Sequence, residues 1–236
     1  MDPLVAFLPG FAQRGDAWVS VAERVAQRYR SVCLDFRSWT FDARLSELAA
    51  RVDDGDALVG YSMGGRLALA AALRRPPRFG AIVLVGTSAG IEDRAERLAR
   101  RREDEELADW IEAHTIEEFA ERWEAQPVFA SQSSELKAAQ RPGRLSHEPE
   151  KLAQLLRSAG QGTFEPVWHE LERIDCPVLA VAGELDTRYA DAAYRVAERV
   201  KRGRARLVAG AGHAPQLERP AEFAELVLDF LDEHLG

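Results

Sequence analysis

The chain has 236 residues, 46% hydrophobic and 30% charged, a size and composition typical of one soluble globular domain. Its formal net charge of -8 argues against a nucleic-acid-binding protein, whose surface is normally basic. The two cysteines, Cys33 and Cys176, provide neither a disulfide framework nor a thiolate set for a metal, so we expect no metal and no cofactor.

The chain begins with Met1–Pro3 and a five-residue hydrophobic run, without the basic segment and longer hydrophobic core of a signal peptide. No stretch approaches the roughly 20 hydrophobic residues that a membrane-spanning helix needs. We therefore expect a cytoplasmic protein with no membrane insertion.

Short hydrophobic runs alternate with amphipathic helical stretches. Parallel strands that are covered on both faces have continuous hydrophobic sequences, so we predict buried strands at Leu4–Leu8, Ser31–Asp35, Ala57–Tyr61, Ala81–Gly86, Val178–Gly183 and Arg206–Ala209. The helical stretches between and after them are Trp18–Tyr29, Ala43–Val52, Gly65–Arg74, Asp191–Val200 and Pro220–Leu235. This alternation predicts an α/β fold with a doubly wound, mainly parallel sheet of about six strands.

The alternation stops over residues 91–171, which are charged, prone to helix and without a core-like strand. We predict that this segment is a helical cap inserted before the last two strands, with residues 1–90 and 172–236 forming the core. Open α/β sheets bind ligands at the carboxyl ends of their strands, so a cap there would cover the site.

The most specific motif is Gly60-Tyr61-Ser62-Met63-Gly64-Gly65, between a predicted strand and a predicted helix. A G-x-S-x-G sequence in that context is a nucleophile elbow, which exposes the serine oxygen on a sharp turn. Side chains at Gly60 and Gly64 would collide with neighbouring backbone in so tight a turn. We predict Ser62 as the catalytic hydroxyl, at a helix N-terminus that favours negative charge.

A serine hydroxyl needs a base, and the base needs an orienting acid. His213 follows the last predicted strand and is the predicted base; the other four histidines read as solvated helical side chains. Asp186 follows the penultimate strand and is the predicted acid, with Glu184 as its competitor. Backbone N–H groups of Met63, directly after the serine, and of Phe11, after the first strand, are the predicted oxyanion hole.

With these residues the chain resembles an α/β-hydrolase. More narrowly, it resembles the 2-succinyl-6-hydroxy-2,4-cyclohexadiene-1-carboxylate synthases of menaquinone biosynthesis. The narrower resemblance rests on Tyr61 and Arg66 around the serine, Arg94-Ala95-Glu96-Arg97, Trp123–Phe129, Arg141 and Leu155–Gly162. The chain departs from that family in having Pro9 where a histidine is usual, in lacking the Gly-rich turn at Asp35–Trp39, and in starting almost on its first strand.

The resemblance implies an elimination of pyruvate in which Ser62, deprotonated through His213, removes a ring proton without forming an acyl-enzyme. It implies a small-molecule polycarboxylate substrate held by Arg66, Arg97 and Arg141, since a guanidinium can grip a carboxylate through two hydrogen bonds. Arg66, four residues after Ser62, also shares its helix face on spacing alone. The resemblance further places Tyr61, Trp123 and Phe129 in the pocket wall.

The sequence is also compatible with other interpretations of these residues. The arginines of 94–102 are interspersed with Glu92, Glu96 and Glu103, a pattern equally typical of a solvated, salt-bridged helix face. A hydrolase of carboxylic esters or carbon–carbon bonds would use the same three residues, with Ser62 attacking a carbonyl. A non-catalytic binding protein on this fold is the third reading. The sequence leaves the oligomeric state open.

Overall fold

The structure is a computed structural model that describes residues 3–74 and 79–236. Residues 1–2 and 75–78 of the predicted core lie outside the described residues. Within the described chain, six strands form one parallel sheet in the order β2-β1-β3-β4-β5-β6. They are β1 (Leu4–Leu8), β2 (Arg30–Cys33), β3 (Ala57–Tyr61), β4 (Ala81–Val85), β5 (Val178–Gly183) and β6 (Gly203–Val208). The predicted six-stranded α/β sheet is confirmed.

Three strands have bounds that differ from the predicted ones. β4 stops at Val85 because Gly86 has a φ of 52° and leaves the strand. The second strand ends two residues early, at Cys33, and the last begins at Gly203 rather than Arg206. Both are edge strands with partly exposed residues, so the continuous hydrophobic run that marks a buried strand does not mark their ends.

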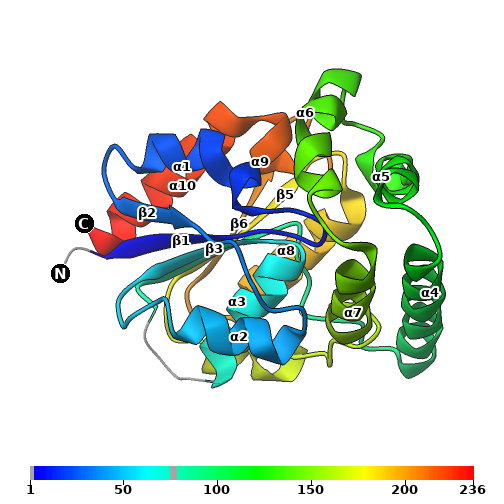
Figure 1. Cartoon of the computed structure of the whole chain (residues 1–236). Coiled ribbons are helices and arrows are strands. Elements are labelled where there is room, and N and C mark those ends of the chain that lie inside the picture. Colours follow the sequence, from blue (N-terminus) through cyan, green and yellow to red (C-terminus); the bar gives the residue numbers. More distant parts are fainter. Residues whose placement is uncertain (1–2, 75–78) are drawn as a thin grey trace.

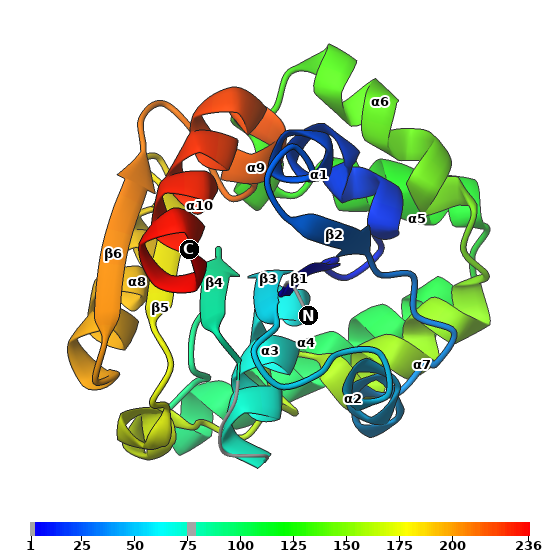
Figure 2. The same cartoon turned by 90° about the vertical axis from the view of Figure 1, so that its left-hand side faces the viewer.

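Helices cover both faces of the sheet (Figures 1 and 2). α1 (Val19–Val25), which follows the 3-10 turn η1 (Gly15–Trp18), and α10 (Pro220–Leu235) pack on one face, where Trp18 and Phe223 are fully buried. The opposite face is covered by α2 (Phe41–Ala49), α3 (Met63–Arg74) and α8 (Thr187–Arg199).

The segment between β4 and β5 is helical. It contains α4 (Arg94–Glu112), α5 (Ile116–Glu124), η2 (Pro127–Phe129), α6 (Ser134–Leu145), α7 (Pro149–Ala159) and η3 (Trp168–Arg173). We call residues 91–171 the cap segment; its α4–α7 lie together beyond one end of the sheet (Figure 1). A small cluster of buried residues, including Ile111, Phe119 and Leu152, joins α4, α5 and α7 and also includes Ala12 of the core.

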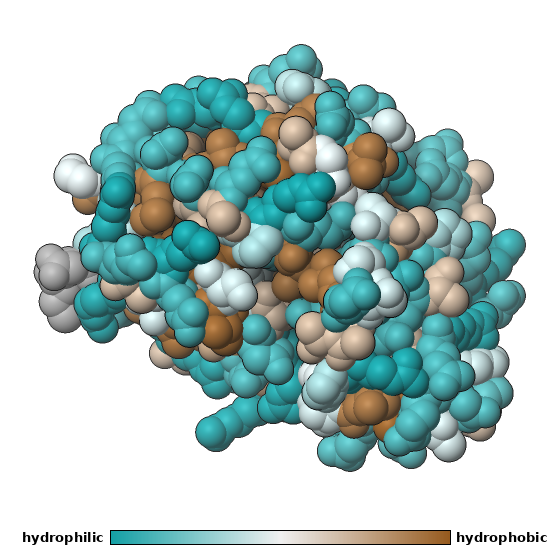
Figure 3. Space-filling view, turned by 90° about the horizontal axis from the view of Figure 1, so that it is seen from above, coloured by the Kyte–Doolittle hydropathy of each residue, from teal (hydrophilic) through white to brown (hydrophobic). Residues whose placement is uncertain are grey.

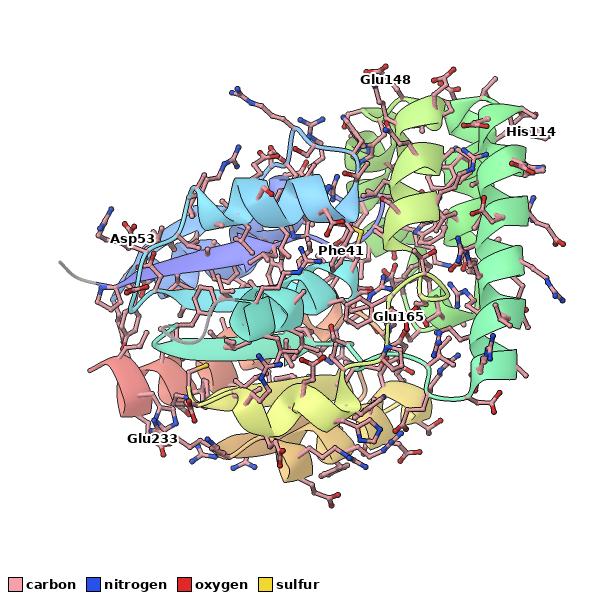
Figure 4. The ribbon with its side chains drawn as sticks, turned by 90° about the horizontal axis from the view of Figure 1, so that it is seen from below. Phe41, Asp53, His114, Glu148, Glu165 and Glu233 are labelled. Atoms are coloured by element: carbon pink, nitrogen blue, oxygen red, sulfur yellow. The ribbon has the colours of Figure 1, made fainter. Side chains whose placement is uncertain are left out.

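The cap segment contacts the core at the N-terminal end of α2. The Phe41 N–H donates to Ser158 Oγ of α7 at 3.1 Å, and the rings of Phe41 and Phe164 meet 5.7 Å apart. Figure 4 shows Phe41 at the end of α2 that faces the cap helices. His147, in the turn between α6 and α7, is buried with its ring edge-on to Trp39, 5.8 Å between centroids. The prediction of a solvated helical histidine is wrong for this residue, because the core loop around Trp39 covers it.

No helix among residues 3–74 and 79–236 has the length and apolar character needed to cross a membrane. The face seen in Figure 3 is mainly hydrophilic, and its hydrophobic side chains occur in small separate groups.

Between β6 and α10 the chain makes a loop and a single helical turn, α9 (Pro215–Glu218). The loop leaves the carboxyl end of β6, on the same edge of the sheet as the β3–α3 turn, since all six strands are parallel. Residues far apart in the sequence thereby reach one edge.

Candidate active site

Ser62 lies on the turn between β3 and α3 with a φ of 51°, in the left-handed region that non-glycine residues rarely adopt. A Cβ at Gly60 would lie 2.5 Å from the Gly64 carbonyl oxygen, and one at Gly64 would lie 2.3 Å from that of Leu8. Only glycine fits at either position. The strained turn is therefore enforced by contacts between main-chain segments.

The turn is also held by hydrogen bonds to β4 and the residues after it. The Ser62 N–H donates to the Val85 carbonyl at 2.8 Å, and the Thr87 hydroxyl lies 3.1 Å from the Ser62 carbonyl oxygen. Thr87 is buried and was not predicted as part of the site. Its place next to the elbow depends on the pairing of β3 with β4, which the motif does not show.

The His213 ring lies against Asp186. His213 Nδ1 is 2.7 Å from Asp186 Oδ2, and both side chains are largely buried. Asp186 is the residue before α8, and its other oxygen accepts from the Tyr189 N–H at 3.4 Å. The competitor Glu184 instead accepts from the Gly210 N–H at 3.0 Å. The geometry therefore favours Asp186 as the partner of the imidazole.

A cavity of about 320 Å³ lies between the sheet edge and the cap segment and is lined by Ser62, Asp186 and His213. The remaining lining residues are Phe11, Gln13, Tyr61, Arg66, Arg100, Trp123, Gln126, Val128, Phe129, Arg144, Leu156, Ala159, Gly160, Gln161, Arg188 and Tyr189. Of the predicted site residues, Phe11, Tyr61, Arg66, Trp123 and Phe129 thus reach the same cavity as the three predicted catalytic residues.

Aromatic rings surround the imidazole. The ring centroids of Tyr189, Tyr61 and Phe129 lie 4.6, 5.3 and 6.3 Å from that of His213. Burial raises the pKa of Tyr61 well above its usual range, so this hydroxyl stays neutral. Trp123 connects Phe129 to Phe11, with centroid distances of 5.9 and 5.1 Å. These rings form the apolar wall of the cavity.

The two predicted oxyanion donors lie on the turns that follow the neighbouring strands β1 and β3. Met63 is the first residue of α3, and Phe11 lies in the turn after β1. Among the described residues, neither backbone N–H is paired with an acceptor. Gly10 is needed before Phe11, because a Cβ there would lie 2.7 Å from the ring of Tyr61. These two N–H groups can therefore be offered to a bound anion.

Arg66 is a buried cation without a full set of partners. Its side chain lines the cavity from α3, its guanidinium lies 5.6 Å from the ring centroid of Phe164, and its Nη1 has no hydrogen-bond acceptor within the described structure. Burial lowers its pKa to about 10, so it remains charged at neutral pH. A buried, unpaired N–H is costly, so an anionic group in the cavity would be strongly favoured there.

Three further arginines line the cavity and were missed. Arg144 is buried and donates to Glu124 Oε1 at 2.9 Å. Arg100 donates to Asp104 at 2.8 Å, while the more exposed Arg188 lies 3.5 Å from Glu96. Together with Arg66 these make four guanidinium groups, and among the described residues that line the cavity Asp186 is the one carboxylate. The cavity lining is thus rich in guanidinium groups although the whole chain is acidic, and Arg66 is the one of the four for which no carboxylate partner is found among the described residues.

Arg97 and Arg141, the other two predicted carboxylate-binding residues, do not line this cavity. Arg97 donates to the Ile91 carbonyl at 3.2 Å and lies 3.4 Å from Glu165. Arg141 pairs with Glu121 and Glu124 at 3.3 and 2.9 Å. Each lies three residues, or about one helical turn, before an arginine that does line the cavity, Arg100 and Arg144 respectively.

The helix face of α4 could have been found from its hydrophobic residues. Ala108 and Ile111 are buried, and stepping back along the same face leads to Asp104 and Arg100. Arg97 lies about one turn further back on nearly the same face, so the hydrophobic residues indicate the face but do not separate Arg97 from Arg100. No comparable hydrophobic pattern distinguishes Arg144 from Arg141 on α6, whose one buried residue is Arg144 itself.

Within the described residues, no group of three or more histidine, cysteine, aspartate or glutamate side chains is arranged to hold a metal ion. The thiols of Cys33 and Cys176 are unpaired, and burial raises the pKa of each to about 11. Neither thiol is therefore a ready nucleophile at neutral pH.

Comparison with known proteins places this geometry among its relatives. Residues 5–226 match the model of the family described as alpha/beta hydrolase. A Bacillus subtilis protein, provisionally named as a 2-succinyl-6-hydroxy-2,4-cyclohexadiene-1-carboxylate synthase, is 37% identical over 177 residues, covering 74% of this chain and 65% of that protein. The Salmonella paratyphi B synthase of that name is 28% identical over 174 residues, covering 74% and 67%. The match thus spans somewhat less than two thirds of the Bacillus subtilis relative.

Solved structures agree over nearly the whole chain. The structure of MenH from S. aureus superposes with a TM-score of 0.94 at 30% identity, covering 99% of this chain and 95% of that one. An esterase from Thermogutta terrifontis superposes with a TM-score of 0.85 at 21% identity, covering 100% and 92%. At that identity the esterase shares the fold alone.

Proposed function

The chain belongs to the alpha/beta hydrolase family, and from that premise we propose that it is a carbon–oxygen lyase. In this proposal it eliminates pyruvate from 2-succinyl-5-enolpyruvyl-6-hydroxy-3-cyclohexene-1-carboxylate. The product is 2-succinyl-6-hydroxy-2,4-cyclohexadiene-1-carboxylate, the compound in the names of two relatives.

The single observation that carries the proposal is the charge of Arg66 in the cavity with Ser62. A buried guanidinium with an unpaired Nη1 would bind a carboxylate strongly and a neutral ester only weakly. The substrate bears several carboxylates. Arg144 and Arg100 line the same cavity, each paired with one carboxylate, and offer further guanidinium N–H groups for them.

The proposed chemistry uses the catalytic residues as a unit. His213, oriented by Asp186 at 2.7 Å, takes the proton of Ser62, and the resulting alkoxide removes the weakly acidic ring proton. The electron pair forms the new double bond as the carbon–oxygen bond to the enolpyruvyl group breaks, and the departing enolate takes the proton held by His213 to become pyruvate. The Phe11 and Met63 N–H groups stabilise the oxyanion that develops in conjugation with the site of proton loss.

The strain at Ser62 supports the same role. A φ of 51° keeps the hydroxyl at the start of α3, where the helix dipole favours an alkoxide. The wall of Tyr61, Tyr189 and Phe129 rings leaves the imidazole largely shielded from water. In such surroundings hydrogen bonds to developing charge are stronger than in water.

The test is to incubate the purified protein with enzymatically generated substrate and to follow pyruvate release together with the absorbance of the cyclohexadiene. We expect both to appear in equal amounts. In parallel, a panel of short p-nitrophenyl esters tests the hydrolase alternative. A rapid burst of p-nitrophenol, with no pyruvate from the first assay, would overturn the lyase proposal and favour an ester hydrolase.

A further inference from the structure

The loop that carries His213 is gripped by one carboxylate. Glu218 Oε2 accepts from the Gly212 N–H at 2.8 Å, and Glu218 Oε1 accepts from the Ala214 N–H at 3.1 Å. The two oxygens therefore hold the backbone immediately before and immediately after His213. Hydrogen bonds to an ionised carboxylate are roughly twice as strong as those between neutral groups.

Glu218, in the short helix α9, and Ala214 hydrogen-bond to each other in both directions. The Glu218 N–H donates to the Ala214 carbonyl at 3.0 Å while its side chain accepts from the Ala214 N–H. Pro215 occupies the first helical position, where a missing N–H costs nothing. Glu218 is thus fixed by its own backbone before its carboxylate reaches back to the loop.

The residues around the His213 imidazole restrict its side-chain rotation, so the ring can move mainly through changes in the backbone. A Cβ at Gly86 would lie 3.1 Å from His213 Cε1, and one at Gly212 would lie 2.0 Å from Ser131 Oγ of the cap segment. The rings of Tyr189 and Tyr61 pack on the imidazole. With the side chain so enclosed, rotation of the peptide planes at 212–214 would move the ring away from Asp186.

We propose that Glu218 is a positioning residue for His213: by bonding both flanking N–H groups, it sets the orientation in which the imidazole meets Asp186 and Ser62. This inference rests on the proposed role of His213 as the base, but it does not depend on which substrate the enzyme takes. Glu218 itself touches no reacting atom in this role.

A merely structural carboxylate would change stability and leave the chemical step alone. A positioning carboxylate changes kcat with little change in KM, because it acts on the base and not on the bound carboxylates. Glu184 offers a matched control. It accepts one N–H of the same loop, that of Gly210, at 3.0 Å, but holds no residue next to the base.

The experiment compares Glu218→Gln, Glu218→Ala and Glu184→Gln in the full-length protein. Glutamine keeps the shape of Glu218 but can accept only one of the two N–H groups and points an NH₂ at the other. We expect kcat to fall on the order of tenfold for Glu218→Gln and about 100-fold for Glu218→Ala, with KM nearly unchanged. Glu184→Gln should stay within about twofold of wild type.

Labelling of Ser62 by a fluorophosphonate probe gives a readout that needs the base but not the natural substrate. The labelling rate should fall in the same order as kcat, and the deshielded His213 Nδ1–H proton resonance should broaden or disappear in Glu218→Ala and persist in Glu184→Gln. If the protein releases no pyruvate at all, the labelling rates still decide the inference.

Wild-type labelling rates and an unchanged Nδ1–H resonance in folded Glu218→Gln would overturn the inference, as would equal losses in Glu218→Gln and Glu184→Gln. Circular dichroism and thermal unfolding check that each variant is folded. Should Glu218→Ala fail to fold, Glu218→Gln and its control carry the decision.

Discussion

The two ends of the candidate cavity are built in different ways. At the end with Ser62, main-chain contacts set the geometry: glycines that admit no side chain, a strained φ, and N–H groups bonded to β4 and to Glu218. At the cap end, the arginines are aimed by single ion pairs, such as Arg144 with Glu124 and Arg100 with Asp104. The first end allows almost no substitution, whereas the second can be changed one side chain at a time.

The largest expected effect is at the main-chain end. Ser62→Ala should lower kcat by on the order of 10⁴- to 10⁶-fold with little change in stability, because the hydroxyl is the proposed base and its loss leaves the fold intact. His213→Ala should do the same, and the double variant should be no worse than either. Steady-state pyruvate release measures all three. Additive losses would show that the two residues do not act as one unit.

Arg66→Ala comes next, because Arg66 is the buried core arginine whose Nη1 has no acceptor in the described structure. Leaving a substrate carboxylate unpaired in a largely buried cavity should cost about 3 to 4 kcal/mol, a loss of roughly 10²- to 10³-fold in kcat/KM. Arg66→Lys should recover only part of this, since an ammonium cannot make the bidentate contact. An unchanged kcat/KM in Arg66→Ala would contradict the carboxylate-binding role.

A third test concerns the pH dependence of stability at His147, where the cap segment packs on the core. Burial, with help from Arg14 and Arg44, lowers the pKa of His147 to about 4. Between pH 6.5 and 4 the unfolded chain therefore binds a proton at this residue that the folded chain does not, so its effect is to lower the free energy of unfolding as the pH falls. The full effect is about 3 kcal/mol.

Urea unfolding of wild type and His147→Phe from pH 7.5 to pH 4 measures this contribution. The phenylalanine variant should lose less stability on acidification than wild type. His169→Phe, at an exposed position, serves as the control and should follow the wild-type curve. Parallel curves for His147→Phe and wild type would refute the assignment.

The smallest expected effect separates neighbouring arginines of the cap segment. Arg144→Ala should raise KM about tenfold because the side chain lines the cavity, whereas Arg141→Ala should change KM less than twofold, since it pairs with Glu121 and Glu124 outside the cavity. Titration of a dicarboxylate competitor checks the same difference at equilibrium. A larger loss in Arg141→Ala would restore the original prediction from the sequence.

The same contrast explains how far the sequence could be read. Ser62, Asp186 and His213 each follow a strand of a parallel sheet, whose carboxyl ends lie at one edge, so their place in the lining of one cavity could be foreseen. The choice between Arg97 and Arg100, which lie about one turn apart, depends on where along α4 the cavity is, and the packing of α4 against the core and α7 determines this. Thr87 and Glu218 act through backbone groups, and no side-chain motif records such contacts.

The place of the cap segment in the chain has a consequence for how such proteins diversify. β4 and β5 are hydrogen-bonded neighbours, with Ile82 beside Val178 and Val85 beside Val181, although the whole cap segment separates them in sequence. The segment thus leaves and re-enters the sheet at one seam. Because the entropic cost of a longer loop grows only slowly with length, a foreign segment spliced at that seam would leave the ladder register untouched. Exchange of this one segment between related genes could then change which ligand is bound and leave Ser62 and its turn unaltered.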